Sequence, residues 1–251
     1  RRRGRIPHRL PKPHPLALKA RAAGLKLVCD IELLARACPA ARFAGITGTN
    51  GKSTTTALLA HILASTGRAV AAGGHLGIPA LDLPELGGDG IYVLELSSFQ
   101  LESVETFRAN VALLLNITPD HMDRYASFEA YADAKYRIFR NQTADDIAIV
   151  NAGEARRVEP ARVWRFSSSA AVGEGAFLDG AELVLRVDGT ETRIPRASLR
   201  LQGNANVENA LAAWLAARAC GVDDSTVEDT FGTFAGLPHR MVVVRERSDV
   251  K

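Results

Sequence analysis

The residues best suited to carry out chemistry lie in the stretch GITGTNGKS, residues 45–53. Gly48 and Gly51 can take positive φ angles, so this turn can aim several backbone N–H groups at a polyphosphate. Lys52 would neutralise the β and γ phosphates of a nucleotide, and Ser53 could bind Mg²⁺ as the first hydroxyl of a helix. The stretch therefore predicts a nucleotide-phosphate site.

The loop departs from the usual pattern GxxxxGK[ST] at one position. Counting back from Gly51, the first glycine would fall at position 46, where the sequence has Ile46. A glycine-rich turn without a ligand is the alternative interpretation. Because an apolar strand leads into the turn and a helix leaves it, we favour phosphate binding. The predicted nucleotide contacts are Gly48, Thr49, Asn50, Gly51, Lys52, Ser53 and Thr54.

Polar side chains also follow two apolar runs elsewhere in the chain. Glu95 comes after the run IYVL, and the pair Asp120–His121 comes after VALLLNI. Open parallel sheets place their ligands at the carboxyl ends of the strands, and a carboxylate there is a natural magnesium ligand. An exposed charge at a strand end is the alternative for Glu95, and Asp-His pairs are common in loops.

Two amides are spaced to share one face of a later helix. Asn206 and Asn209 lie three residues apart at the start of the apolar pattern NVENALAAWLAARACG. They could serve as capping or surface amides, or could offer a paired donor and acceptor to a nucleotide base.

The elements that would position these residues alternate between strands and helices. Apolar runs without polar alternation predict strands covered on both faces, at residues 25–30, 42–48, 69–73, 91–96, 111–117 and 146–151. Helical patterns fall at residues 15–23, 31–38, 52–66, 206–221 and 225–236. After Val163 the residues alternate around Asp-Gly pairs, which predicts hairpins. We therefore expect an α/β fold, a mostly parallel sheet flanked by helices, with a small antiparallel sheet in addition.

Composition limits the class of protein. The chain has 251 residues, of which 47% are hydrophobic and 24% charged, enough for one large or two modest domains. No apolar run reaches the roughly 18–20 residues of a membrane helix, so we expect a cytoplasmic protein without a membrane partner. The three cysteines Cys29, Cys38 and Cys220 lack metal-ligand spacing and are expected to be core residues.

The net charge of +3 does not indicate a nucleic-acid partner. Six basic residues and no acidic residue fall within the first twelve positions, so the excess is confined to a proline-rich arm at the start of the chain. No aromatic residues interleave with these charges, and we expect no nucleic acid to bind.

The segment 45–56 resembles the loop of the Mur ligase family, TGTNGK[ST], which has the same offset glycine. Three further stretches, LELSSFQLE (94–102), NITPDHMDRY (116–125) and GLPHRM (236–241), are similar to those of the members that join D-glutamate to UDP-N-acetylmuramoyl-L-alanine. The similarity extends over most of residues 14–245. It implies a P-loop NTPase-like central fold and peptidoglycan-precursor synthesis.

The resemblance also implies roles for individual residues. ATP would bind with two Mg²⁺ ions, the first held by Ser53 and Glu95 and the second by His121 and a carbamylated Lys135. Lys52, His121 and Lys135 would be catalytic, and Arg240 would reach the ATP phosphates. Asn206 and Asn209 would contact adenine. The muramoyl substrate would lie beside His75, Ser97, Ser98 and Gln100.

Two positions depart from the family pattern. The family's GGNIG is GGHLG here, so His75 replaces an asparagine, and Ala205 replaces the histidine that precedes the first adenine-site asparagine. Either change could weaken contacts with the nucleotide or substrate.

By resemblance we divide the chain into three parts. Residues 1–38 would be the basic arm and a remnant of a UDP-binding domain, residues 39–238 the central ATP-binding domain, and residues 239–251 the start of a linker to a missing C-terminal domain.

The leading interpretation is that the chain is the central domain of an ATP-dependent amide ligase that works through an acyl phosphate. We expect this enzyme to be a monomer. A folylpolyglutamate synthase-like ligase is one alternative, which the SSFQLE and GLPHRM stretches disfavour. A truncated ATP-binding module without catalysis is the other. We expect ATP binding with weak or no ligation by this chain.

Overall fold

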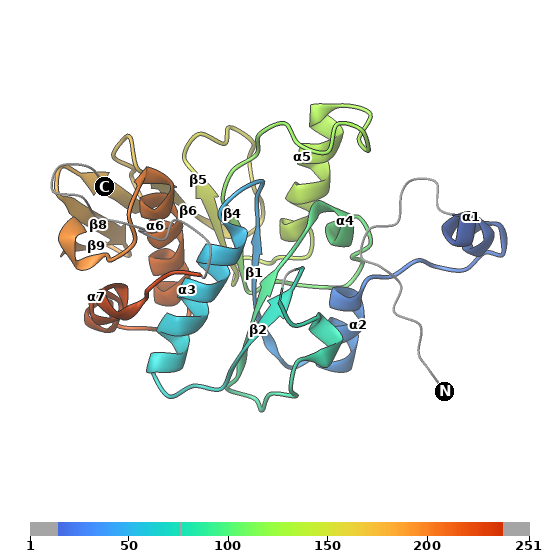
Figure 1. The fold of residues 1–251 in the computed structure, drawn as a ribbon, viewed down its shortest axis with the longest axis horizontal. Helices are drawn as coiled ribbons and strands as arrows, with labels where there is room; N and C mark the ends of the chain where they lie inside the picture. Colours follow the sequence, from blue (N-terminus) through green and yellow to red (C-terminus); the bar gives the residue numbers. More distant parts are fainter. Residues whose placement is uncertain (1–14, 76, 238–251) are drawn as a thin grey trace, which may run out of the picture.

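The computed structural model describes residues 15–75 and 77–237, in which a single large sheet forms the centre of the molecule (Figure 1). The strand order is β2-β3-β1-β4-β5-β6-β7-β8-β9. All neighbours from β2 to β7 pair parallel, and the last three strands pair antiparallel. The strands are β1 (Arg42–Thr47), β2 (Val70–Gly74), β3 (Ile91–Glu95), β4 (Val111–Leu114), β5 (Ile147–Asn151), β6 (Arg162–Ser167), β7 (Gly175–Asp179), β8 (Glu182–Val187) and β9 (Thr190–Pro195).

This arrangement confirms the predicted α/β fold with a mostly parallel sheet. The antiparallel strands predicted after Val163 are present, and they continue the large sheet. Strand β6 was not predicted, and it connects the parallel part to the hairpins.

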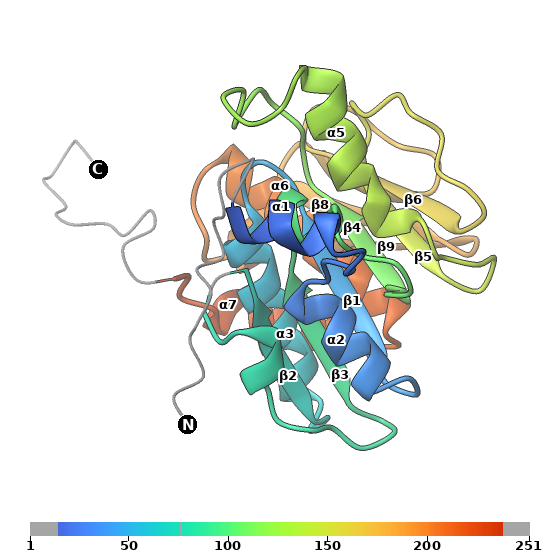
Figure 2. The same cartoon turned by 90° about the vertical axis from the view of Figure 1, so that its right-hand side faces the viewer.

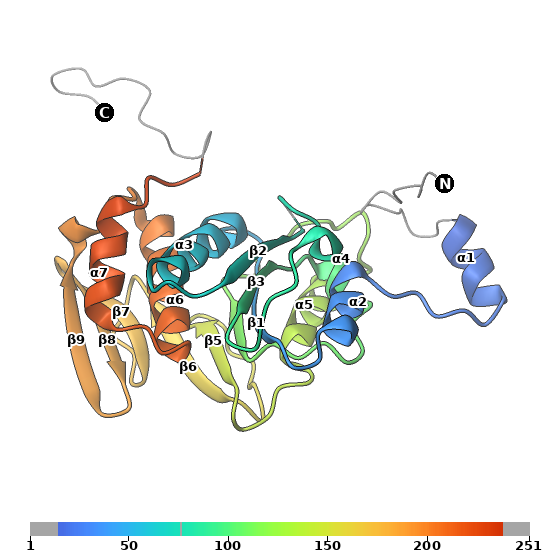
Figure 3. The same cartoon turned by 90° about the horizontal axis from the view of Figure 1, so that it is seen from below.

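Helices cover both faces of the sheet, as Figure 3 shows from below. Helices α3 (Lys52–Ser65), α6 (Asn204–Ala219) and α7 (Asp224–Thr233) share one apolar core with strand residues such as Ile46 and Val93. Helices α2 (Asp30–Ala37) and α4 (Ser98–Leu101) pack with Phe43 and Leu94 on the opposite face, where α5 (Phe128–Tyr136) also lies. Successive strand residues thus point to opposite cores, which explains the continuous apolar runs.

Helix α1 (Pro15–Ala22) lies at one end of the molecule, away from the sheet, and Figure 2 shows it in front of the other elements when viewed from that end. The predicted strand at residues 25–30 is wrong: residues 25–29 have no regular structure and Asp30 begins α2. A strand needs a partner to satisfy its backbone, and no described strand pairs with this segment.

Three further sequence-based expectations concern local features. The three cysteines form no disulfide; Cys220 is buried in one apolar core, whereas Cys29 and Cys38 are only partly buried against the other. None of the helices in residues 15–75 and 77–237 has the length and apolar character to cross a bilayer. The basic arm lies outside the described residues.

A charged network lines the outer hairpin. Arg193 on β9 makes ion pairs with Asp179, Glu182 and Glu191. These three carboxylates lie on the neighbouring strands β7, β8 and β9. All four side chains are exposed, so the network adds little to the free energy of unfolding.

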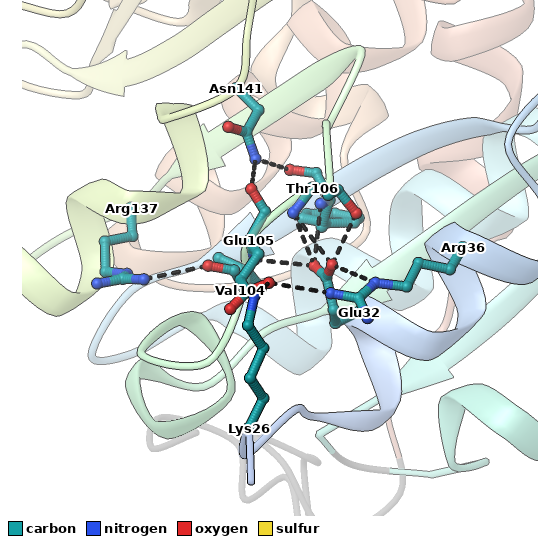
Figure 4. A network of polar contacts seen from close by, with 9 residues as sticks. Lys26, Glu32, Arg36, Val104, Glu105, Thr106, Arg137 and Asn141 are labelled. Atoms are coloured by element: carbon teal, nitrogen blue, oxygen red, sulfur yellow. Dashed lines mark hydrogen bonds and ion pairs between the residues drawn. The ribbon is translucent and has the colours of Figure 1, made fainter. Parts of the chain in front are cut away.

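A buried carboxylate joins α2 to the loop that follows α4 (Figure 4). Glu32 is fully buried, accepts hydrogen bonds from the backbone N–H groups of Glu105, Thr106 and Phe107, and pairs with Arg36 at 2.8 Å. Burial by itself would raise the pKa of Glu32, but the hydrogen bonds from the Thr106 hydroxyl and these N–H groups outweigh it and lower the pKa to about 2. Ile31 and Leu34 are buried in the same core as Phe43 and Leu94, so α2 packs against the sheet.

We predict that Glu32→Gln lowers the free energy of unfolding by about 3 kcal/mol at pH 7. The folded state holds the pKa of Glu32 near 2 instead of 4.5, and this difference corresponds to a stabilisation of about that size, which the neutral glutamine loses. The depressed pKa stabilises the fold fully above pH 4.5, and this contribution is lost as the pH falls toward 2. Urea unfolding of both proteins at pH 7 and pH 3 measures the difference. The exposed Glu85→Gln is the control, and an equal effect of the two substitutions at pH 7 would contradict the assignment.

Candidate nucleotide site

The predicted phosphate loop lies between the carboxyl end of β1 and the start of α3. Gly48 and Gly51 have φ angles of 156° and 85°, and Gly51 is the N-cap residue of α3 in the left-handed region. A Cβ atom added at Gly51 would lie 2.2 Å from Oδ1 of Asn209. Glycine at this position is therefore required both by the backbone conformation and by the close approach of α6.

The segment after β4 holds the loop from one side. Asn116 accepts from the N–H of Asn50 through Oδ1 at 2.8 Å and donates to the Asn50 carbonyl at 3.1 Å. The Thr49 N–H donates to the Asn116 carbonyl, and the Thr49 hydroxyl contacts Thr118 and the Tyr131 hydroxyl. These bonds fix the turn and leave the start of α3 facing the site.

Two lysines meet at the loop. Lys52 Nζ donates to the carbonyls of Gly48 and Thr49 at 3.0 Å each. Lys135 Nζ, on α5, donates to the same Gly48 carbonyl at 2.8 Å and lies 4.7 Å above the ring of Tyr131. Two ammonium groups thus share one acceptor, which concentrates positive charge where a polyphosphate would lie.

The pKa of Lys135 is strongly perturbed. Only 2% of the residue is exposed, and this burial, followed by the nearby Lys52 ammonium, lowers its pKa to about 7. The negative charges of Asp120 and Glu95 raise the pKa of Lys135, but by less. A lysine on a helix is usually solvated, so a buried lysine with a perturbed pKa in a cavity is a candidate functional residue.

A small cavity brings together many of the residues that the sequence singled out. Its volume is about 30 Å³, and its lining is Lys52, His75, Ser97, Ser98, Phe99, Asp120, His121, Tyr131 and Lys135. The three residues expected to be catalytic are all in this set. His121 has a φ angle of 55°, and its ring lies 5.0 Å from that of Phe99 and 3.5 Å from a carboxylate oxygen of Asp120.

Glu95 lies at the carboxyl end of β3, as predicted, and is 2% exposed. It pairs in register with Ile46 on β1 and Gly74 on β2, so it sits beside the strand that leads into the loop. Neither Glu95 nor Ser53 lines a described cavity. Within the described ranges, no three His, Cys, Asp or Glu side chains gather as a preformed metal centre.

A larger cavity of about 320 Å³ lies on the other side of the loop. Asn50, Gly51 and Thr54 form its loop side, and Asn206 and Asn209 come from α6. The two asparagines are 6–8% exposed and hydrogen-bond to each other at 3.2 Å. The rest of the lining is Leu115, Asn116, Phe166, Leu201, Ala205, Glu208, Gly236 and Leu237. Apolar walls with a few polar groups suit a nucleoside.

Gln100, expected beside the substrate, is not part of either cavity lining. Its Oε1 accepts from the backbone N–H and hydroxyl of Ser97, and its Nε2 donates to Asp30 at 2.9 Å. Ser97 is the N-cap residue of α4, and Gln100 completes the capping box and so orients Ser97, which does line the small cavity. The spacing Ser97-x-x-Gln100 is that of a capping box, a signal that sequence reasoning missed.

Tyr131 was also missed. It precedes Lys135 by four residues and so occupies the same helix face, a spacing that could have pointed to it. Arg240, expected at the ATP phosphates, lies outside the described residues.

Comparison with protein-family models matches residues 46–217 to the Mur ligase middle domain. Curated relatives include a UDP-N-acetylmuramoylalanine–D-glutamate ligase of Paramagnetospirillum magneticum, 46% identical and covering 96% of this chain and 54% of the relative. The ligase of the same name from Trichlorobacter lovleyi is 44% identical, covering 96% of this chain and 55% of the relative. The chain thus spans about half the length of the curated relatives it matches.

Solved structures share the fold. A UDP-N-acetylmuramate-alanine ligase from Thermotoga maritima aligns with a TM-score of 0.63 at 22% identity, covering 95% of this chain and 56% of that one. A UDP-N-acetylmuramate:L-alanyl-gamma-D-glutamyl-meso-diaminopimelate ligase from Neisseria meningitides aligns with a TM-score of 0.66 at 20% identity, covering 91% and 77%. At these identities the likeness concerns the fold alone.

We predict that Lys135→Met stabilises the protein at pH 6 relative to wild type, by an amount that disappears as the pH rises. The folded-state pKa of about 7 lies below the usual 10.5, so the cost of the buried charge is complete below pH 7 and is relieved between pH 7 and 10.5. The difference is on the order of a few kcal/mol. Chemical denaturation at pH 6 and pH 9 measures it, with the exposed Lys19→Met as control. A pH-independent difference would contradict the perturbed pKa.

Proposed function

This chain belongs to the Mur ligase family, and we propose that it carries the ATP-binding centre of a ligase that joins D-glutamate to UDP-N-acetylmuramoyl-L-alanine. The single observation that carries the proposal is the small cavity, in which Lys52 of the loop meets His121 and Lys135 from separate elements. Sequence spacing did not require these three side chains to meet. The names of the curated relatives support the choice of substrates.

In this proposal the triphosphate lies along the loop and the nucleoside occupies the large cavity. The start of α3 offers backbone N–H groups and Lys52 offers charge, which suits the terminal phosphates. The amides of Asn206 and Asn209 face the nucleoside. Arg240 keeps its proposed role at the phosphates.

The residues present fit the magnesium ions that the family implies. Ser53 and Glu95 would hold the first ion, and His121 with Lys135 the second. Magnesium usually takes one or two protein oxygens and completes its octahedron with phosphates and water, and the Ser53 hydroxyl with the Glu95 carboxylate would offer such oxygens. The ions would neutralise charge that develops on the transferred phosphoryl group.

Lys135 would become a metal ligand by carbamylation. Its pKa of about 7 leaves a large fraction of the amine neutral at physiological pH, and only a neutral amine can attack carbon dioxide. The buried site also supplies Lys52 as a cationic neighbour for the resulting carbamate.

The proposed reaction has two steps. The carboxylate of UDP-N-acetylmuramoyl-L-alanine attacks the γ-phosphate, giving ADP and an acyl phosphate. The amine of D-glutamate then displaces phosphate to form the amide. Phosphoryl transfer asks the protein mainly for positioning and charge neutralisation, which Lys52 and the loop N–H groups supply. His75, Ser97 and Ser98 line the same cavity and would position the muramoyl side, with Gln100 holding Ser97.

The proposal extends to the organisation of the whole protein. The described residues would supply the nucleotide side of the reaction. Residues 1–38 would be the basic arm and a remnant of a UDP-binding domain, and residues 239–251 the start of a linker to a C-terminal domain. The protein would act in the cytoplasm as a monomer. An ATP-binding module without catalysis is the alternative, and an assay for the amide product separates the two.

We predict that Lys52→Ala weakens ATP binding roughly 10- to 100-fold, because a charge-assisted hydrogen bond to phosphate is lost. Isothermal titration calorimetry with Mg²⁺-ATP measures the change in Kd. The exposed Lys19→Ala should bind like wild type, and circular dichroism should show that both variants are folded. Unchanged ATP affinity in Lys52→Ala would refute the loop assignment.

A further inference from the structure

We propose that Glu208, held by Ser168, accepts a hydrogen bond from the nucleoside and thereby makes the site selective among nucleotides. This inference rests on the proposed function, since it assigns a residue to nucleoside recognition in the large cavity.

The first turns of α6 form one wall of that cavity. Ala205, Asn206, Glu208 and Asn209 all line it, a spacing that places the four residues on one face of the helix. Ala205 contributes only a methyl group. Glu208, one turn later, is therefore the polar residue of this wall beside the asparagine pair, and it is the one charged side chain among the described residues that line this cavity.

The Glu208 carboxylate is held by a serine that follows β6. The Ser168 hydroxyl donates to its Oε1 at 2.9 Å. Among the described residues, Ser168 is the only hydrogen-bond partner of this side chain. A carboxylate offers about four lone-pair positions, so Glu208 has capacity to accept from a ligand in the cavity it lines.

The contacts also show which part of a nucleotide Glu208 would meet. Asn209 lies against the loop, since its Oδ1 accepts from Thr55 at 3.3 Å and approaches Gly51. Glu208 instead joins Ser168, two residues beyond Phe166, whose ring lines the cavity. A carboxylate repels phosphate. Glu208 is thus suited to the nucleoside, and the phosphates to the Lys52 side.

A carboxylate accepts and does not donate, so it recognises N–H or O–H groups. A nucleoside offers two such sources: the exocyclic amino group of adenine and the hydroxyls of ribose. A site built to hydrogen-bond a donor of its ligand discriminates against analogues that lack this donor. Inosine triphosphate lacks the amino group, and 2′,3′-dideoxy-ATP lacks the hydroxyls, so these two probes separate the sources.

The test compares four ligands by calorimetry with Mg²⁺: ATP, inosine triphosphate, 2′,3′-dideoxy-ATP and tripolyphosphate. We expect wild type to bind ATP about tenfold or more tightly than one of the two analogues. Glu208→Ala should abolish that difference without changing the affinity for tripolyphosphate, and alanine is well tolerated in a helix. Ser168→Ala should reduce the difference in part, because the carboxylate loses its positioning partner. The exposed Glu85→Ala is the control.

Discrimination that persists in Glu208→Ala, or wild type that binds all three nucleotides equally, would overturn the inference while the proposed function stands. Wild type that binds neither ATP nor tripolyphosphate would refute the proposed function itself, and this inference with it. The two failures are therefore distinguishable.

Discussion

The site depends on one buried hydrogen bond, from Lys135 Nζ to the Gly48 carbonyl. This bond ties α5 on one face of the sheet to the loop that precedes α3 on the other face. A buried ammonium is costly unless it has partners, and Tyr131 lies directly beneath it. In the proposed chemistry the same lysine would be both close to phosphate and partly neutral.

Much of the architecture could be predicted from the sequence, because the parallel strands are covered on both faces. Runs such as Ile91–Glu95 and Val111–Leu114 contain few polar residues, and they lie between two apolar cores. Gly48 and Gly51 both have the positive φ angles that the turn was expected to need. The family resemblance, rather than spacing, supplied Lys135, which a pattern alone would have assigned to solvent.

The remaining features could not be predicted from the local sequence, because they depend on contacts between distant parts of the chain. The segment at residues 25–29 has the composition of a strand, but a strand forms only with a partner, and none of the described strands pairs with it. Gln100 illustrates a different limit: the same polar residue suits a substrate contact or a helix cap, and only the coordinates show its bonds to Ser97 and Asp30. Likewise, Ser168 and Glu208 are 40 residues apart in the chain, and tertiary packing brings them together.

The charged hairpin at the far side of the sheet has a consequence for the protein in solution. Strand β9 is a terminal strand of the sheet, so its outer row of peptide groups is a template onto which another chain could add. Arg193 and its acidic partners Asp179, Glu182 and Glu191 set charged side chains close to this border. An incoming strand would have to desolvate these charges, which makes the addition of a strand at this border costly.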